Sequence, residues 1–169
     1  MPRAPVRTVL ETNVVLSTVI RGGTPGTLIE YRPRTQTHLE FTSTQFPALP
    51  EEDERVNPGL YGKRLAAYLS SELPGHGFAV THMNPEDWGW RIDLENAAFP
   101  LLIGCGASGD PPERFLIFSE PSRPFIRRLF RRIPTTAVVE RLASTLHSIL
   151  AQSGMADEIR RRDPDEVTR

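Results

Sequence analysis

Two periodicities in the pattern of apolar and polar residues predict where helices and strands lie along this chain. Apolar residues recur at helical spacing over residues 60–73 and again over residues 135–152. Asn57-Pro58 predicts the start of the first helix, and Pro74-Gly75 predicts its end. Short β-branched and aromatic runs between turn-forming residues predict strands at 38–46, 77–83, 85–96, 98–106 and 114–120.

The segment between Pro124 and Pro134 also fits a helical period. Its apolar residues gather on one side of a helix: Phe125, Ile126, Leu129, Phe130 and Ile133. From residue 38 the expected order is therefore strand, helix, four strands and two helices. This order predicts an α+β fold, in which a mostly antiparallel sheet of four to five strands carries about three helices on one face.

The composition excludes several classes of protein. The chain has 169 residues and a net charge of −1, so no overall positive field attracts nucleic acid. A single cysteine, Cys105, excludes an internal disulfide and a cysteine-cluster metal site. No apolar run is long enough for a membrane span, and the broken N-terminal apolar stretch argues against a signal peptide. We expect a cytoplasmic protein.

A short motif near the N-terminus carries the first candidate chemistry. An apolar run ends in Glu11-Thr12-Asn13, and the loop Gly22-Gly23-Thr24-Pro25 leads into Leu28-Ile29-Glu30. Residues 7–30 thus resemble the start of the PIN-domain ribonucleases, the toxins of many bacterial toxin–antitoxin pairs, whose first strand ends in Asp-Thr-Asn. The resemblance implies RNA hydrolysis with Mg²⁺ or Mn²⁺, and Glu11 as a metal ligand.

The chain offers no clear partners for Glu11. One carboxylate cannot hold a divalent ion against water, and Glu replaces the Asp of the motif. The acidic run 51–54 lies in a loop bounded by prolines, where we expect a solvated turn rather than a metal site. The metal-dependent PIN-type ribonuclease is therefore the alternative hypothesis, with an incomplete and inactive site.

The motifs between residues 40 and 150 belong to a different resemblance. The segments "FTSTQF", "NPGLYGK", "PEDWGW" and "FPLLIGCG" resemble an uncharacterised family of small bacterial proteins. This resemblance implies a fold but no mechanism. We therefore divide the chain into a partial PIN-like segment with a linker (1–37), an α+β domain (38–150) and a charged, flexible tail (151–169).

Two short stretches of the α+β domain are candidate ligand sites. Trp88 and Trp90 are expected on one face of a strand, where they either grip a flat ligand or fill the core. Gly104, Cys105 and Gly106 permit a tight bend or a close approach to a ligand. Cys105 as a nucleophile would need a nearby base, and three histidines are available in the sequence, namely His76, His82 and His147.

The strongest electrostatic feature is a group of five arginines at positions 123–132. We call Arg123, Arg127, Arg128, Arg131 and Arg132 the basic strip. A strip of this kind meets an acidic protein partner, phosphates or an anionic lipid, or it solubilises the outer face of a docked helix.

These observations favour a binding or interaction module without assignable catalysis. The candidate contact residues of this module are Trp88 and Trp90, the Gly104–Gly106 segment and the basic strip. We expect a protein partner and no cofactor. Nucleic acid, and Mg²⁺ or Mn²⁺, belong only to the ribonuclease alternative.

Overall fold

The structure is a computed structural model, and it describes residues 36–50, 52–108 and 113–163. All of these residues lie in the compact unit that spans residues 33–169. The PIN-like segment and its candidate ligand Glu11 lie outside the described residues.

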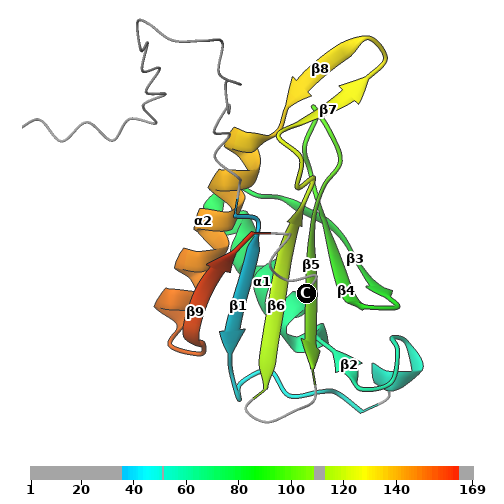
Figure 1. Cartoon of the computed structure of the whole chain (residues 1–169). Helices are drawn as coiled ribbons and strands as arrows, with labels where there is room; N and C mark the ends of the chain where they lie inside the picture. The colour runs from blue at the N-terminus through cyan, green and yellow to red at the C-terminus, as the bar shows by residue number, and fades with distance from the viewer. Residues whose placement is uncertain (1–35, 51, 109–112, 164–169) are drawn as a thin grey trace, which may run out of the picture. The chain divides into compact units, whose positions relative to one another are not determined.

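A curved antiparallel sheet forms the body of the domain (Figure 1). Its strands are β1 (His38–Thr42), β2 (Leu60–Tyr61), β3 (Val80–Glu86), β4 (Gly89–Leu94), β5 (Leu101–Ser108), β6 (Arg114–Glu120) and β9 (Asp157–Arg162). The spatial order is β3-β4-β5-β6-β1-β9, and the short strand β2 pairs separately with β5. All of these pairings are antiparallel. The α+β class and the mostly antiparallel sheet are confirmed, while the expected four to five strands were too few.

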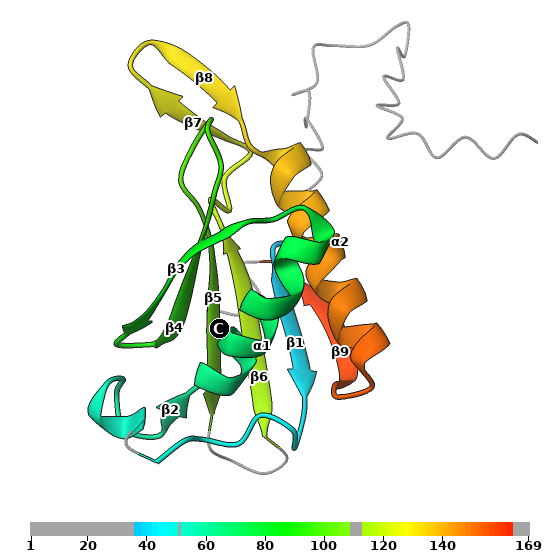
Figure 2. The ribbon, with the colours of Figure 1, turned by 180° about the vertical axis from the view of Figure 1, so that it is seen from behind.

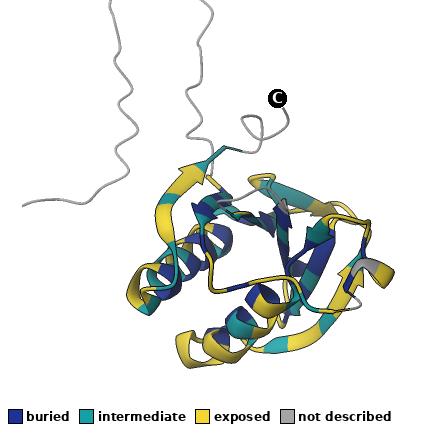
Figure 3. Cartoon of the chain, turned by 90° about the horizontal axis from the view of Figure 1, so that it is seen from below, coloured by how far each residue is buried: buried dark blue, intermediate teal, exposed yellow. Residues whose placement is uncertain are grey.

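Two α-helices, α1 (Lys63–Glu72) and α2 (Thr136–Ser153), cover the same face of the sheet (Figure 2). Alternate sheet residues and the apolar helix stripes form the core between these layers, which is coloured dark blue in Figure 3. In β6, for example, Phe115 and Ile117 are buried while their neighbours are more exposed. The opposite face of the sheet carries no helix among the described residues.

Helix α1 begins later than the sequence predicted, and its N-terminus is capped from a distance. Asn57-Pro58 was expected to start the helix, but the first helical residue is Lys63, and its N-cap Gly62 has no capping side chain. The side chain of Glu52, in the 3-10 turn η1 (Glu52–Glu54), serves as the cap instead. Its Oε1 accepts hydrogen bonds from the amides of Gly62 (2.8 Å) and Lys63 (2.7 Å). The acidic run is therefore not simply a solvated turn, because Glu52 is buried.

The end of α1 follows the sequence signal more closely. A second 3-10 turn, η2 (Leu73–His76), follows the helix directly and contains Pro74 and Gly75. Gly77 then takes a positive φ of 80°, a conformation that suits glycine.

The third expected helix is absent from the described residues. Residues 125–134 instead form a two-stranded hairpin of β7 (Phe125–Arg128) and β8 (Arg131–Pro134). The prediction was wrong because an apolar spacing of three and four residues also arises when two short strands flank a two-residue turn. The hairpin projects from one end of the sheet (Figure 1).

The charged tail was also predicted wrongly over the part that the structure describes. Helix α2 runs to Ser153, and Gly154 ends it with a φ of 66°. Residues 157–162 then form the edge strand β9, which pairs with β1. Arginines on an edge strand are compatible with pairing and discourage contact with further strands, so the charge misled the prediction.

Candidate functional site

The β7–β8 hairpin is built on a nearly palindromic sequence. Its register pairs like with like: Ile126 faces Ile133, Arg127 faces Arg132, and Arg128 faces Arg131. The two isoleucines are partly buried and pack against the core, which anchors the base of the hairpin. The arginines farther out are exposed. The anchor and the free end are therefore distinct parts of one short element.

Four members of the basic strip thus form two directly facing pairs of like charge. Neighbours across an antiparallel pair hold their Cβ atoms about 4.5–5.5 Å apart, and like charges in these positions are destabilising. None of the four forms an ion pair with a described residue. Arg132 lies over the ring of Phe125, with its guanidinium carbon 4.6 Å from the ring centroid. The fifth member, Arg123, is exposed just before β7.

The tip of the hairpin carries two large apolar side chains. Leu129 and Phe130 form the two-residue turn, and their exposed fractions are 91% and 105%. The φ of Leu129 is 55°, a value that Gly or Asn usually occupies in such turns. The fold thus keeps a leucine where its backbone is strained and its side chain packs on nothing within the described residues.

A shallow groove runs beside the hairpin. Its volume is about 580 Å³, and residues 96–100 form one wall. Ile126, Arg127 and Arg128 of β7 form the other wall. Cationic side chains and apolar carbon atoms therefore line the same groove.

Trp88 belongs to a second exposed feature, an aromatic row on the helix-free face of the sheet. Its ring centroid lies 5.0 Å from that of Phe118 in β6. On the other side of Phe118, His38 of β1 stacks at 5.8 Å. Burial lowers the pKa of His38, and the nearby Glu120 carboxylate opposes this shift.

Trp88 and Trp90 do not share a face, contrary to the prediction. Trp88 lies in the two-residue turn between β3 and β4 and is 38% exposed, while Trp90 is 2% exposed in the core. The turn redirects the chain at Gly89, whose φ is 142°. The interpretation of Trp90 as a core residue is therefore the one that its burial supports.

Gly104, Cys105 and Gly106 lie in the central strand β5 rather than in a bend. A Cβ on Gly104 would lie 2.1 Å from the ring of Phe118, so this glycine makes room for the aromatic row. A Cβ on Gly106 would meet the Trp88 carbonyl oxygen at 3.0 Å. These glycines serve close packing within the sheet.

The thiol of Cys105 is unsuited to nucleophilic attack. It is fully buried, and burial raises its pKa well above the usual range. Two of the histidines considered as its base, His76 and His82, are exposed. The structure therefore gives no support to a cysteine-dependent enzyme.

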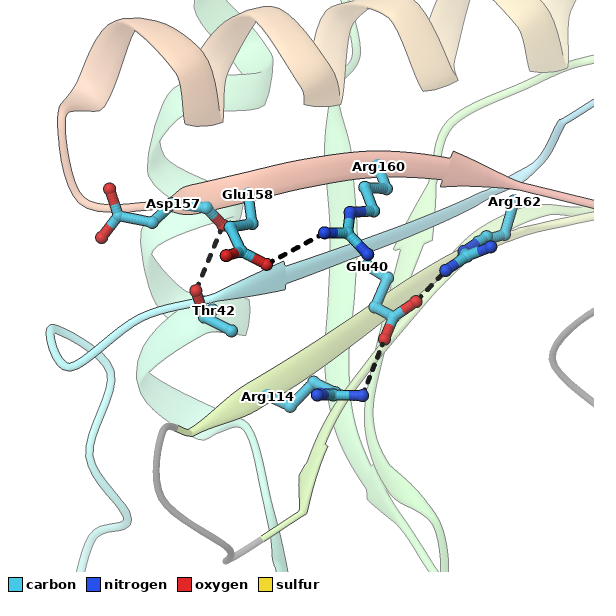
Figure 4. Close-up of polar contacts among 7 residues, drawn as sticks. All are labelled: Glu40, Thr42, Arg114, Asp157, Glu158, Arg160 and Arg162. Atoms are coloured by element: carbon cyan, nitrogen blue, oxygen red, sulfur yellow. Dashed lines mark hydrogen bonds and ion pairs between the residues drawn. The ribbon is translucent and has the colours of Figure 1, made fainter.

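A network of charged side chains crosses the helix-free face near the sheet edge (Figure 4). Glu40 of β1 accepts from Arg114 at 3.4 Å and from Arg162 at 3.2 Å, and Arg160 pairs with Glu158 at 3.1 Å. These arginines have carboxylate partners, whereas the hairpin arginines have none among the residues that the structure describes. The network therefore joins β6, β1 and β9 and leaves little charge for a ligand.

The described residues contain neither a candidate metal cluster nor a helix that could span a membrane. No group of three or more His, Cys, Asp or Glu side chains there has the proximity to hold a metal ion. No described helix is long and apolar enough to cross a membrane.

No family model, curated protein or solved structure matches this chain. The resemblances to the PIN-domain ribonucleases and to the small bacterial family therefore stay predictions.

Sequence analysis found the arginines of the hairpin but missed its apolar tip. Leu129 and Phe130 were assigned to the apolar side of a helix, whereas they lie in a turn and are the most exposed large apolar residues that the structure describes. The usable signal was the symmetry of "IRRLFRRI", which places identical residues opposite each other around a two-residue centre.

Proposed function

We propose that this chain is a non-catalytic binding module that docks through the β7–β8 hairpin onto a negatively charged partner. The observation that carries the proposal is that two pairs of arginines face each other across the hairpin, Arg127 with Arg132 and Arg128 with Arg131. They lie at the exposed end of a hairpin and have no ion-pair partner among the described residues.

An anionic partner relieves a repulsion that the hairpin otherwise bears. Each facing pair places two positive charges at a spacing that destabilises a hairpin. Phosphate or carboxylate groups between the guanidinium groups convert this repulsion into charge-assisted hydrogen bonds. Elsewhere on the domain, the arginines at 114, 160 and 162 already contact carboxylates. The hairpin, in contrast, holds four arginines in facing pairs without such contacts among the described residues.

The docking proposal is tested by size-exclusion chromatography of a native lysate that retains its membrane fragments, from the organism that carries the gene. We expect the unchanged chain to elute in a larger assembly, and the variant R128E/R131E to elute as the free chain. The control variant R55E/R64E changes two exposed arginines outside the hairpin and alters the net charge equally. It should stay in the assembly. Identical elution of all three proteins would contradict the proposal.

The metal-dependent ribonuclease remains a second proposal, because Glu11-Thr12-Asn13 resembles the Asp-Thr-Asn motif of the PIN-domain family, with Glu in place of Asp. Because the sequence predicts an incomplete site, cleavage of RNA by the full chain with Mg²⁺ or Mn²⁺ that E11Q abolishes would be needed to establish an active ribonuclease. Absence of cleavage in the unchanged chain with either metal would leave the binding module as the sole proposal.

A further inference from the structure

We propose that the negatively charged partner is the surface of a lipid bilayer with anionic head groups. Leu129 and Phe130 insert between the lipids, and the facing arginines bind the phosphates around them. This inference rests on the proposed docking function and names its partner.

The order of side chains along the hairpin matches the layers of a bilayer surface. The outermost residues are apolar and almost fully exposed, at 91% for Leu129 and 105% for Phe130. The pair Arg128 and Arg131 follows one residue behind the turn, and Arg127 with Arg132 one residue farther. Since a strand rises about 3.3 Å per residue, a tip at the acyl boundary places both arginine pairs at head-group depth.

The surroundings of the hairpin favour a flat partner. The hairpin projects from one end of the sheet, so its tip reaches a plane before the rest of the described body does (Figure 1).

The apolar tip distinguishes a bilayer from nucleic acid. A duplex binds the arginines through its phosphates, but it accepts an apolar wedge only by unstacking base pairs. A bilayer provides phosphates and an apolar layer within one surface and needs no such distortion. The open groove of about 580 Å³ beside Arg127 and Arg128 lies behind the tip, on the side of the hairpin base.

The strained turn supplies a variant that separates binding from folding. The substitution L129N/F130G removes both apolar side chains, and the new residues suit the turn because Asn tolerates the positive φ of position 129 and Gly accepts the backbone conformation of Phe130. Because Leu129 already has a φ of 55°, this variant should keep the hairpin. A loss of binding in L129N/F130G then reports the missing side chains rather than an unfolded hairpin.

The test is co-sedimentation of the full chain with vesicles of phosphatidylcholine, with or without phosphatidylserine. We expect binding only with phosphatidylserine, weakened at least about tenfold in L129N/F130G and in R128E/R131E but unchanged in the control R55E/R64E. The variant F130W should gain a blue-shifted component of tryptophan emission with the anionic vesicles, relative to the unchanged chain. This shift reports entry of the tip into an apolar layer.

Several results would overturn the membrane inference. They are no binding to anionic vesicles, equal binding by L129N/F130G, or an F130W spectrum that the vesicles do not change. If the vesicles fail but the lysate assembly still depends on Arg128 and Arg131, the partner is an acidic protein or a nucleic acid and the docking function stands. If the hairpin arginines matter in neither experiment, both proposals fall.

Discussion

The buried carboxylate of Glu52 should be among the most sensitive positions of the fold. Its Oε2 accepts a hydrogen bond from the amide of Leu49 at 3.0 Å, while its Oε1 serves the amides of Gly62 and Lys63. Glu52 is 3% exposed. One side chain thus joins the loop before η1 to the first turn of α1, and it places a negative charge at the positive end of that helix.

The substitution E52A should lower the free energy of unfolding by about 3–5 kcal/mol. Hydrogen bonds to charged groups contribute about 1.5–3 kcal/mol each, and leaving a buried donor unpaired costs about 1–3 kcal/mol. The Gly62 amide is buried, whereas the other two amides are partly buried. Water can therefore form part of the hydrogen bonding that these two amides lose. The sum is therefore smaller than three full hydrogen bonds.

The substitution E52Q preserves the shape and one acceptor oxygen. That oxygen can still bind the Gly62 and Lys63 amides, but the new NH₂ group faces the Leu49 amide, donor against donor. We expect about half the loss of E52A. The assay is urea unfolding, with E54Q, an exposed glutamate of the same turn, as a control that stays within about 0.5 kcal/mol of the unchanged chain. This account of the helix start would be refuted if the free energy of unfolding of E52A were less than about 1 kcal/mol below that of E54Q.

Three further predictions concern the sheet. The substitution G104A should destabilise the fold by about 1–3 kcal/mol in urea unfolding, because its Cβ displaces the Phe118 ring, and an unchanged midpoint would contradict this packing. The Cys105 thiol should react with a thiol reagent only as fast as the protein unfolds, and rapid labelling of the native chain would show that it is accessible. Since burial depresses the pKa of His38 in the folded state, its neutral form favours folding above the usual value of 6.5, and this contribution is lost as pH falls below it. Unfolding free energies between about pH 7.5 and about pH 5.5 should therefore fall more for the unchanged chain than for H38N, and equal falls would exclude this role.

The sequence predicted best where one period dominates a segment. The strand expected at 114–120 has these same bounds in the structure, and the helix expected at 135–152 is α2 at 136–153. In β6 a short apolar run lies between turn-forming residues, and its buried and less buried residues alternate; in α2 the buried apolar residues form one stripe. Burial on one face fixes such segments regardless of their neighbours.

The candidate site was harder to predict because a turn decides its geometry. A two-residue turn separates Trp88 from Trp90, and another separates Arg128 from Arg131. Strand periodicity assumes a continuous strand, so it placed both tryptophans on one face. The hairpin turn at Leu129 lacks the usual Gly or Asn, which removed the local signal for it.

Long-range contacts account for the remaining differences. Glu52 caps a helix that begins eleven positions later, and nothing in the acidic run distinguishes it from its exposed neighbour Glu54. The strand β9 has mostly charged residues and is held by pairing with β1, far away in the sequence. Local propensity does not report such partners.

The central claim is that the hairpin arginines hold this chain to an anionic partner. The most direct test compares the R128E/R131E and R55E/R64E variants in the same native lysate by size-exclusion chromatography. The account predicts that only R128E/R131E is released from the larger assembly. Release of both variants alike, or of neither, would contradict it.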